Sequence, residues 1–92
     1  MRYLRVYVSG PPDIETTEAD QRLRAAGYAP YIASYRPGME TTRLAFLAVC
    51  DAVVLLPGYP SEGDQELGIA GTQGIRAYAG VDEVLESQRE YL

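Results

Sequence analysis

Hydrophobic and polar residues follow two alternating patterns along this chain. Short runs rich in β-branched and aromatic residues, each bounded by turn residues, predict strands at 3–8, 28–33, 51–56 and 74–78. Apolar residues that recur every three or four positions predict helices at 14–26, 39–50, 63–73 and 81–92. The pattern therefore predicts strands and helices that alternate from one end of the chain to the other.

This alternation indicates the arrangement of the sheet. Strands separated by helices of about a dozen residues imply right-handed crossovers and a parallel sheet. The run 51–56 is continuously apolar, which is typical of a strand covered on both faces, whereas Pro30 suits an edge strand. We predict an α/β fold with a four-stranded parallel sheet of order 2-1-3-4. Its topological switch point, where such sheets bind ligands, lies between strands 1 and 3.

Amino-acid composition excludes several classes of ligand and catalytic site. A chain of 92 residues suits a single domain, 1–92, and its net charge of −5 argues against binding a nucleic-acid polymer. The eight basic residues are all arginine and histidine is absent, so lysine Schiff bases, Ser-His-Asp catalysis and histidine metal sites are excluded. We expect no metal and no cofactor, with carboxylates or tyrosines carrying any chemistry.

Cysteine content and hydropathy bear on location. Cys50 is the single cysteine and lies in an apolar run, so we interpret it as a small buried hydrophobe in a cytoplasmic protein. No run has the roughly 18 apolar residues of a membrane span, and we expect no membrane partner. Because so small a domain buries a modest core, we expect a homo-oligomer, with 39–50 and the terminal helix as candidate contacts.

Glu66 is the most informative carboxylate. It follows the strand 51–56 and a Gly/Pro loop, near the start of the helix 63–73. If Gly63 is the N-cap, Glu66 occupies the third helical position and can bond back to a cap amide. Alternatively, it is a reactive group beside an open, glycine-rich mouth that contains Gly58, Tyr59 and Gly63. The residue pattern leaves both interpretations open.

Other candidate residues lie near the same sheet edge. Tyr7 is either a core tyrosine or a hydrogen-bond donor that orients Glu66. Ser9, Gly10 and Pro11 are either an ordinary turn or a cradle for a phosphate. Arg43, like Arg36, is either a solvated cation or part of an anion clamp. Asp51 lies at the opposite end of its strand, and we interpret it as structural.

Four segments in order resemble a known family. They are Val6-Tyr-Val-Ser-Gly-Pro11, Leu23-Arg-Ala-Ala-Gly-Tyr28, Cys50-Asp-Ala-Val-Val-Leu-Leu-Pro-Gly58 and Ser61-Glu-Gly-Asp-Gln-Glu-Leu-Gly-Ile-Ala70. Together they resemble the nucleoside 2-deoxyribosyltransferase-like superfamily of small phage and bacterial proteins, which includes nucleotide N-glycosidases. The resemblance covers roughly residues 3–78 and implies a flavodoxin-like, Rossmann-like three-layer fold.

The resemblance also implies a reaction. Glu66 would attack the anomeric carbon of a deoxynucleoside or its monophosphate, and Tyr7 would orient it. Ser9 and Gly10 would line the sugar or its 5′-phosphate. A retaining mechanism with a glycosyl-enzyme suits a carboxylate, because the transition state resembles an oxocarbenium ion.

The sequence departs from the family at three places. Arg43 replaces the Asp that usually handles the base, the loop after strand 1 is short, and Ala33-Ser34 replace Asn-Pro. A carboxylate helper would have to come from Glu62, Asp64 or Glu40. We therefore expect an enzyme of N-glycosidic bond cleavage or transfer. The alternatives are a nucleotide-binding module without turnover and a phage interaction protein on the same fold.

Overall fold

The computed structural model describes residues 5–10, 14–59 and 62–89, which form four strands and four helices in strict alternation. The strands are β1 (Arg5–Ser9), β2 (Ala29–Ile32), β3 (Ala52–Leu55) and β4 (Arg76–Tyr78). The helices are α1 (Ile14–Ala25), α2 (Glu40–Val49), α3 (Glu62–Thr72) and α4 (Val81–Arg89). The predicted elements are confirmed, with ends that shift by a few residues.

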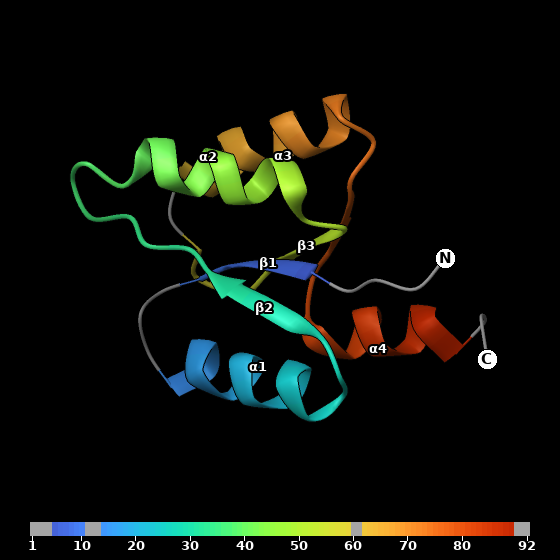
Figure 1. Ribbon diagram of the computed structural model, residues 1–92. Helices are drawn as coiled ribbons and strands as arrows, with labels where there is room; N and C mark the ends of the chain where they lie inside the picture. The colour runs from blue at the N-terminus through green and yellow to red at the C-terminus, as the bar shows by residue number, and fades with distance from the viewer. Residues whose placement is uncertain (1–4, 11–13, 60–61, 90–92) are drawn as a thin grey trace.

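The sheet is parallel throughout and has the order β2-β1-β3-β4, as predicted. In its register, Tyr7 of β1 lies opposite Tyr31 of β2 on one side and Val53 of β3 on the other. Figure 1 shows α2 and α3 on one face of the sheet and α1 and α4 on the other. The molecule is therefore a three-layer, Rossmann-like α/β sandwich.

Two hydrophobic cores fill the spaces between the layers. Val6 and Val8 point from β1 toward α1 and α4, while Tyr7 points the other way toward α2 and α3. This division follows from the alternation of side chains along a strand. The first three residues of β3 are buried, which confirms the prediction of a strand covered on both faces. Pro30 lies in the edge strand β2, where its missing N–H leaves no gap in the ladder.

The ends of two elements have clear local causes. Helix α1 stops at Gly27, whose φ of 91° is accessible to glycine, and the Tyr28 N–H reaches back to the Leu23 carbonyl at 2.9 Å. At the amino-terminal end of the sheet, the Asp51 carboxylate accepts the Arg5 N–H at 2.9 Å. Asp51 is thus a structural residue, far from the edge that carries Glu66.

The inward face of α2 differs from the predicted one. The apolar pattern of 39–50 predicts that Leu44, Leu47 and Ala48 face inward. Leu47 is buried and Leu44 is partly buried, but Ala48 is exposed. Arg43 and Cys50 are buried instead. Arg43 and Leu47 are four residues apart and share one stripe of the helix, and Cys50 follows as its C-cap with an extended backbone. The prediction of the inward face followed the apolar residues and therefore did not include the arginine.

The predicted carboxyl-terminal helix is confirmed over Val81–Arg89, and its last three predicted positions lie outside the described residues. Val81 and Val84 are buried and Leu85 packs against them, whereas Leu92 lies outside the described residues. Among the helices in residues 5–10, 14–59 and 62–89, none is long and apolar enough to cross a membrane.

Candidate functional site

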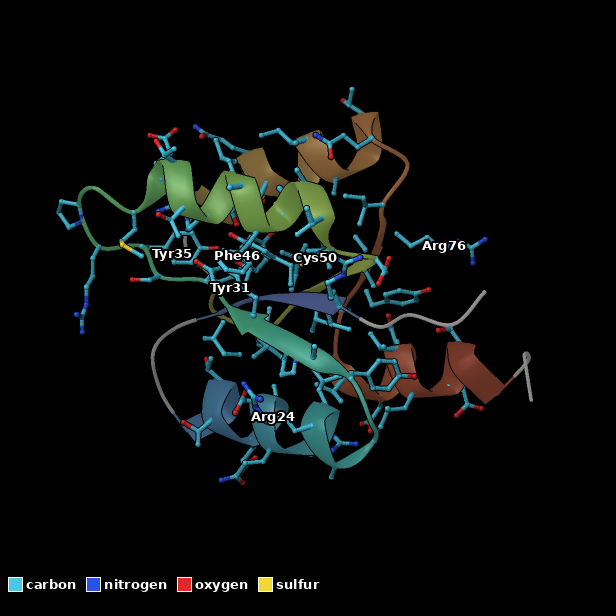
Figure 2. All side chains as sticks on the ribbon, in the orientation of Figure 1. Arg24, Tyr31, Tyr35, Phe46, Cys50 and Arg76 are labelled. Carbon is cyan, nitrogen blue, oxygen red and sulfur yellow. The ribbon has the colours of Figure 1, made fainter. Side chains whose placement is uncertain are left out.

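Four polar side chains meet above the carboxyl ends of β1 and β3, at the switch point of the sheet. They come from four parts of the chain: Ser9 from the end of β1, Tyr35 from the loop after β2, Arg43 from α2 and Glu66 from α3. In Figure 2, Tyr35 lies between the end of β2 and the start of α2. We call these four residues the carboxylate cluster.

Glu66 is the centre of the carboxylate cluster. Its side chain is 2% exposed, and among the described residues each carboxylate oxygen has one donor. Oε1 accepts a hydrogen bond from Arg43 Nε at 2.8 Å, and Oε2 accepts one from the Tyr35 hydroxyl at 2.8 Å. Because α3 begins at Glu62, Glu66 lies beyond the first turn and faces the sheet with Gly63 and Ala70. The N-cap interpretation of Glu66 is therefore wrong.

Arg43 is the charge partner of Glu66. The residue is 7% exposed, and its Nη1 donates to the Ser34 carbonyl at 3.0 Å. Burial works against the guanidinium charge, but the hydrogen bond and the charge of Glu66 outweigh it and raise the pKa of Arg43. The interpretation of Arg43 as a solvated cation is wrong. Arg43 does bind an anion, and that anion is the carboxylate of Glu66.

Tyr35 is the residue that the sequence did not reveal. Its hydroxyl lies 2.5 Å from Ser9 Oγ, and its ring lies under the Arg43 guanidinium with 4.6 Å from the guanidinium carbon to the ring centroid. Since the Tyr35 proton points to Glu66, Ser9 donates to Tyr35. A tyrosine in the loop after β2 carries no periodic signal, so only its place beside Ser9 and Glu66 identifies it.

Tyr7 lies under the carboxylate cluster without joining its hydrogen bonds. Its hydroxyl is buried and, among the residues with described side chains, finds no partner of acceptable geometry. Burial first, and then the nearby Glu66 carboxylate, raise the pKa of Tyr7 well above its ordinary value. Tyr7 is therefore next to Glu66, as predicted, but Tyr35 and Arg43 hold the carboxylate in its place.

The turn after β1 is closely covered. Ser9 is fully buried, and a Cβ built on Gly63 would lie 2.9 Å from Ser9 Oγ and 2.5 Å from the Tyr59 ring. Gly63 thus lets α3 approach β1 closely. Gly10 is packed against Leu56, so neither Ser9 nor Gly10 presents an open cradle. Pro11, the third residue of that predicted cradle, lies outside the described residues.

The loop after β3 forms the outer rim. Gly58 is exposed with φ of 83°, and the Tyr59 hydroxyl donates to Asp64 at 2.7 Å. Asp64 is thereby engaged away from Glu66. No described group of three or more Cys, Asp or Glu side chains is arranged to hold a metal ion.

Two surface hollows adjoin the carboxylate cluster. One, of about 480 Å³, is lined by Gly10 and the segment 32–36. The other, of about 360 Å³, is lined by the segment 35–38 together with Glu40, Arg43 and Gln65. Glu40, one of the expected carboxylate helpers, is thus beside Arg43. Glu66 itself lines neither hollow.

Because the Tyr35 hydroxyl is partly buried, we expect the protein to lose stability in alkali. Burial, partly offset by the Ser9 hydrogen bond and reinforced by that to Glu66, raises the pKa of Tyr35 to about 12. An unfolded chain releases this proton near pH 10. The stabilisation that the raised pKa of Tyr35 contributes is therefore fully present below about pH 10 and falls as the pH rises toward 12. We expect Tyr35→Phe to lose roughly 1–2 kcal/mol less than the wild type over this interval in urea titrations. Equal losses in both proteins would contradict the assignment.

Comparisons with protein-family models, with curated proteins and with solved structures found no match to this chain. The resemblance to the deoxyribosyltransferase-like superfamily therefore stays a prediction from the four segments. The part of it that the structure bears out is the parallel α/β fold with strand order 2-1-3-4.

Proposed function

We propose that this protein cleaves or transfers at the N-glycosidic bond of a deoxynucleoside or its monophosphate, with Glu66 as the nucleophile. The proposal depends on one observation: a buried carboxylate at the switch point, ion-paired to Arg43 at 2.8 Å. A buried charge is costly unless it is paired, and pairing here keeps an anion at the position where open α/β folds bind ligands.

The geometry leaves the carboxylate capable of attack. An ionised carboxylate has about four lone-pair sites, and the donors Arg43 and Tyr35 occupy two of them. A free lone pair forms the bond to the anomeric carbon while the bond to the base breaks and its electron pair leaves with the base nitrogen. Water or a second base then resolves the glycosyl-enzyme and restores the carboxylate.

Arg43 and Glu40 would complete the machinery. Attack neutralises Glu66 and releases the Arg43 charge, which can then stabilise negative charge on the departing base. Glu40 lines the same hollow as Arg43, and we assign it the role of the helper that gives the base its proton. Arg36, exposed and bordering both hollows, is the candidate for a 5′-phosphate.

A nucleotide-binding module without turnover is the second candidate. It is favoured by the 2% exposure of the Glu66 side chain, because a nucleophile must contact its substrate. In that case the ion pair between Glu66 and Arg43 would only fix the shape of the pocket. The two functions differ in whether base release follows binding.

The test is a panel of deoxynucleosides and deoxynucleoside 5′-monophosphates. Each is incubated with the protein, and the free base is separated by chromatography, with and without a second base as acceptor. We expect release from at least one member. Nucleotide binding without release from any member would support the binding module and contradict the enzyme.

We also propose that the protein self-associates through the outer face of α2. From 41 to 49 the one ionic residue is Arg43, which is buried, while Phe46 and Val49 are 45% and 48% exposed. Phe46 stacks on Tyr31 of the edge strand at 4.1 Å between ring centroids. A two-fold contact joins a surface to itself, so in a chain of net charge −5 an uncharged face is the one that avoids repulsion.

Introducing a charge tests this contact. Phe46→Asp is expected to weaken self-association at least about tenfold, because the contact would place two carboxylates together without partners. Light scattering coupled to size exclusion measures the mass as the protein is diluted. Gln21→Asp adds the same charge on exposed α1 and should leave the mass unchanged. A monomeric wild type, or a dimer that persists in Phe46→Asp, would contradict the contact.

A further inference from the structure

Tyr35 and Arg36 are the two residues that line both hollows beside the carboxylate cluster. The first hollow lies on the side of Gly10 and Ile32, and the second on the side of Arg43 and Gln65. The Arg36 side chain is exposed, whereas the Tyr35 side chain runs inward to Ser9 and Glu66. Tyr35 therefore forms the partition between the two spaces.

We propose that Tyr35 is a gate, and that its movement joins the two hollows into one ligand cavity with Glu66 in its wall. In the closed state the Tyr35 hydroxyl bridges Ser9 Oγ and Glu66 Oε2 at 2.5 and 2.8 Å. The oxygen that Tyr35 occupies is the one that becomes available when the ring leaves. The closed gate explains why a carboxylate at the switch point is buried while open space lies on both sides.

The loop that carries Tyr35 is built to allow this movement. Arg36, Pro37 and Gly38 are exposed, and Gly38 has φ of 88° with open space around it. The backbone turn from Met39 N to the Arg36 carbonyl closes the loop at 3.1 Å. Inside, the ring rests under the Arg43 guanidinium, whose hydrogen bond to Glu66 does not involve Tyr35. Tyr35 can thus leave while the ion pair stays intact.

The joined cavity indicates the class of ligand. The first half is walled by Gly10, Ile32 and Ala33, which suits a flat apolar ring. The second half presents Glu40, Arg43 and Gln65, which suit the hydrogen-bonding edge of that ring. A ligand hydroxyl would replace that of Tyr35 between Ser9 and Glu66. The choice of a nucleoside within this class rests on the proposed function, whereas the gate does not.

Carboxylate labelling tests the gate without any ligand. The folded protein is treated with a water-soluble carbodiimide and a small amine, and modified positions are located by peptide mass mapping, with exposed Glu18 and Glu83 as internal references. We expect little modification of Glu66 in the wild type. Tyr35→Phe removes a hydrogen bond to a charged group and should raise Glu66 modification about tenfold to a hundredfold, with Tyr35→Ala at least as high.

A matched tyrosine serves as the control. The Tyr59 hydroxyl also donates to a carboxylate, Asp64 at 2.7 Å, but Tyr59 lines neither hollow, so Tyr59→Phe should leave Glu66 unmodified. Circular dichroism establishes that each variant is folded. If Tyr35→Ala does not fold, Tyr35→Phe, which keeps the ring, carries the test alone. Wild-type Glu66 labelled as fully as Glu18, or no increase in folded Tyr35→Phe, would overturn the gate. Absence of base release would overturn the enzyme and leave this result untouched.

Discussion

Replacing Arg43 by methionine is expected to lower the free energy of unfolding by about 3–5 kcal/mol at neutral pH. Methionine fills the volume of the arginine stem but leaves the Glu66 carboxylate buried without its charge partner. A domain of this size has a total stability of roughly 5–15 kcal/mol, so this one side chain decides whether most molecules are folded at elevated temperature. Urea denaturation followed by circular dichroism measures the change.

The double variant Arg43→Met/Glu66→Leu is the matched control. It removes both charges, and it is expected to recover most of the stability that Arg43→Met alone loses, because an apolar pair of similar volume has no buried charge to solvate. If Arg43→Met cost less than about 1 kcal/mol, the ion pair would behave as a solvated surface pair. That result would contradict the burial of both side chains.

Replacing Glu66 by glutamine is expected to reduce base release at least about a thousandfold, because the amide cannot form the glycosyl ester. Glutamine preserves the shape and retains an oxygen that can accept from Arg43 or Tyr35. Nucleotide binding, measured by calorimetry, should therefore survive the loss of turnover. The comparison requires a substrate found in the nucleoside panel.

Asp64→Asn is the control for this substitution. Asp64 is an exposed carboxylate on the same helix, two positions before Glu66, and it accepts from Tyr59. Its replacement should leave base release within about twofold of the wild type. Equal activities of Glu66→Gln and the wild type would contradict the role of Glu66 as nucleophile. A loss of base release in Asp64→Asn as large as that in Glu66→Gln would contradict a role specific to Glu66.

The fold could be predicted from the sequence because its signals are local and repeated. The β-branched runs, the stop at Gly27 and the continuous apolar run of β3 each act over a few residues, and together they imply the order of the sheet. The edge position of β2 followed from the missing N–H of Pro30. These features express backbone chemistry, which a single sequence displays directly.

The carboxylate cluster could be predicted only in part. Glu66 and the neighbourhood of Tyr7 followed from the sheet order, which brings the ends of β1 and β3 together. The partners of Glu66 did not, because they depend on the rotation of α2 and on a loop side chain. A periodicity rule places an arginine outside, and only the opposing carboxylate makes its burial favourable. No periodicity rule applies to Tyr35, because it lies in a loop.

The parallel register of β1 also has a consequence for how the chain folds. Tyr7 pairs with Tyr31 and with Val53, so neither neighbour of the central strand can be reached by a hairpin. Every strand pairing must close a long loop before it gains any contact, which places this domain among the slower folders for its length. Glu66 follows β3 in the chain and Arg43 precedes it, so their ion pair is itself a nonlocal contact that has to close a loop. We therefore expect the ion pair between Arg43 and Glu66 to form during refolding after the helices have appeared.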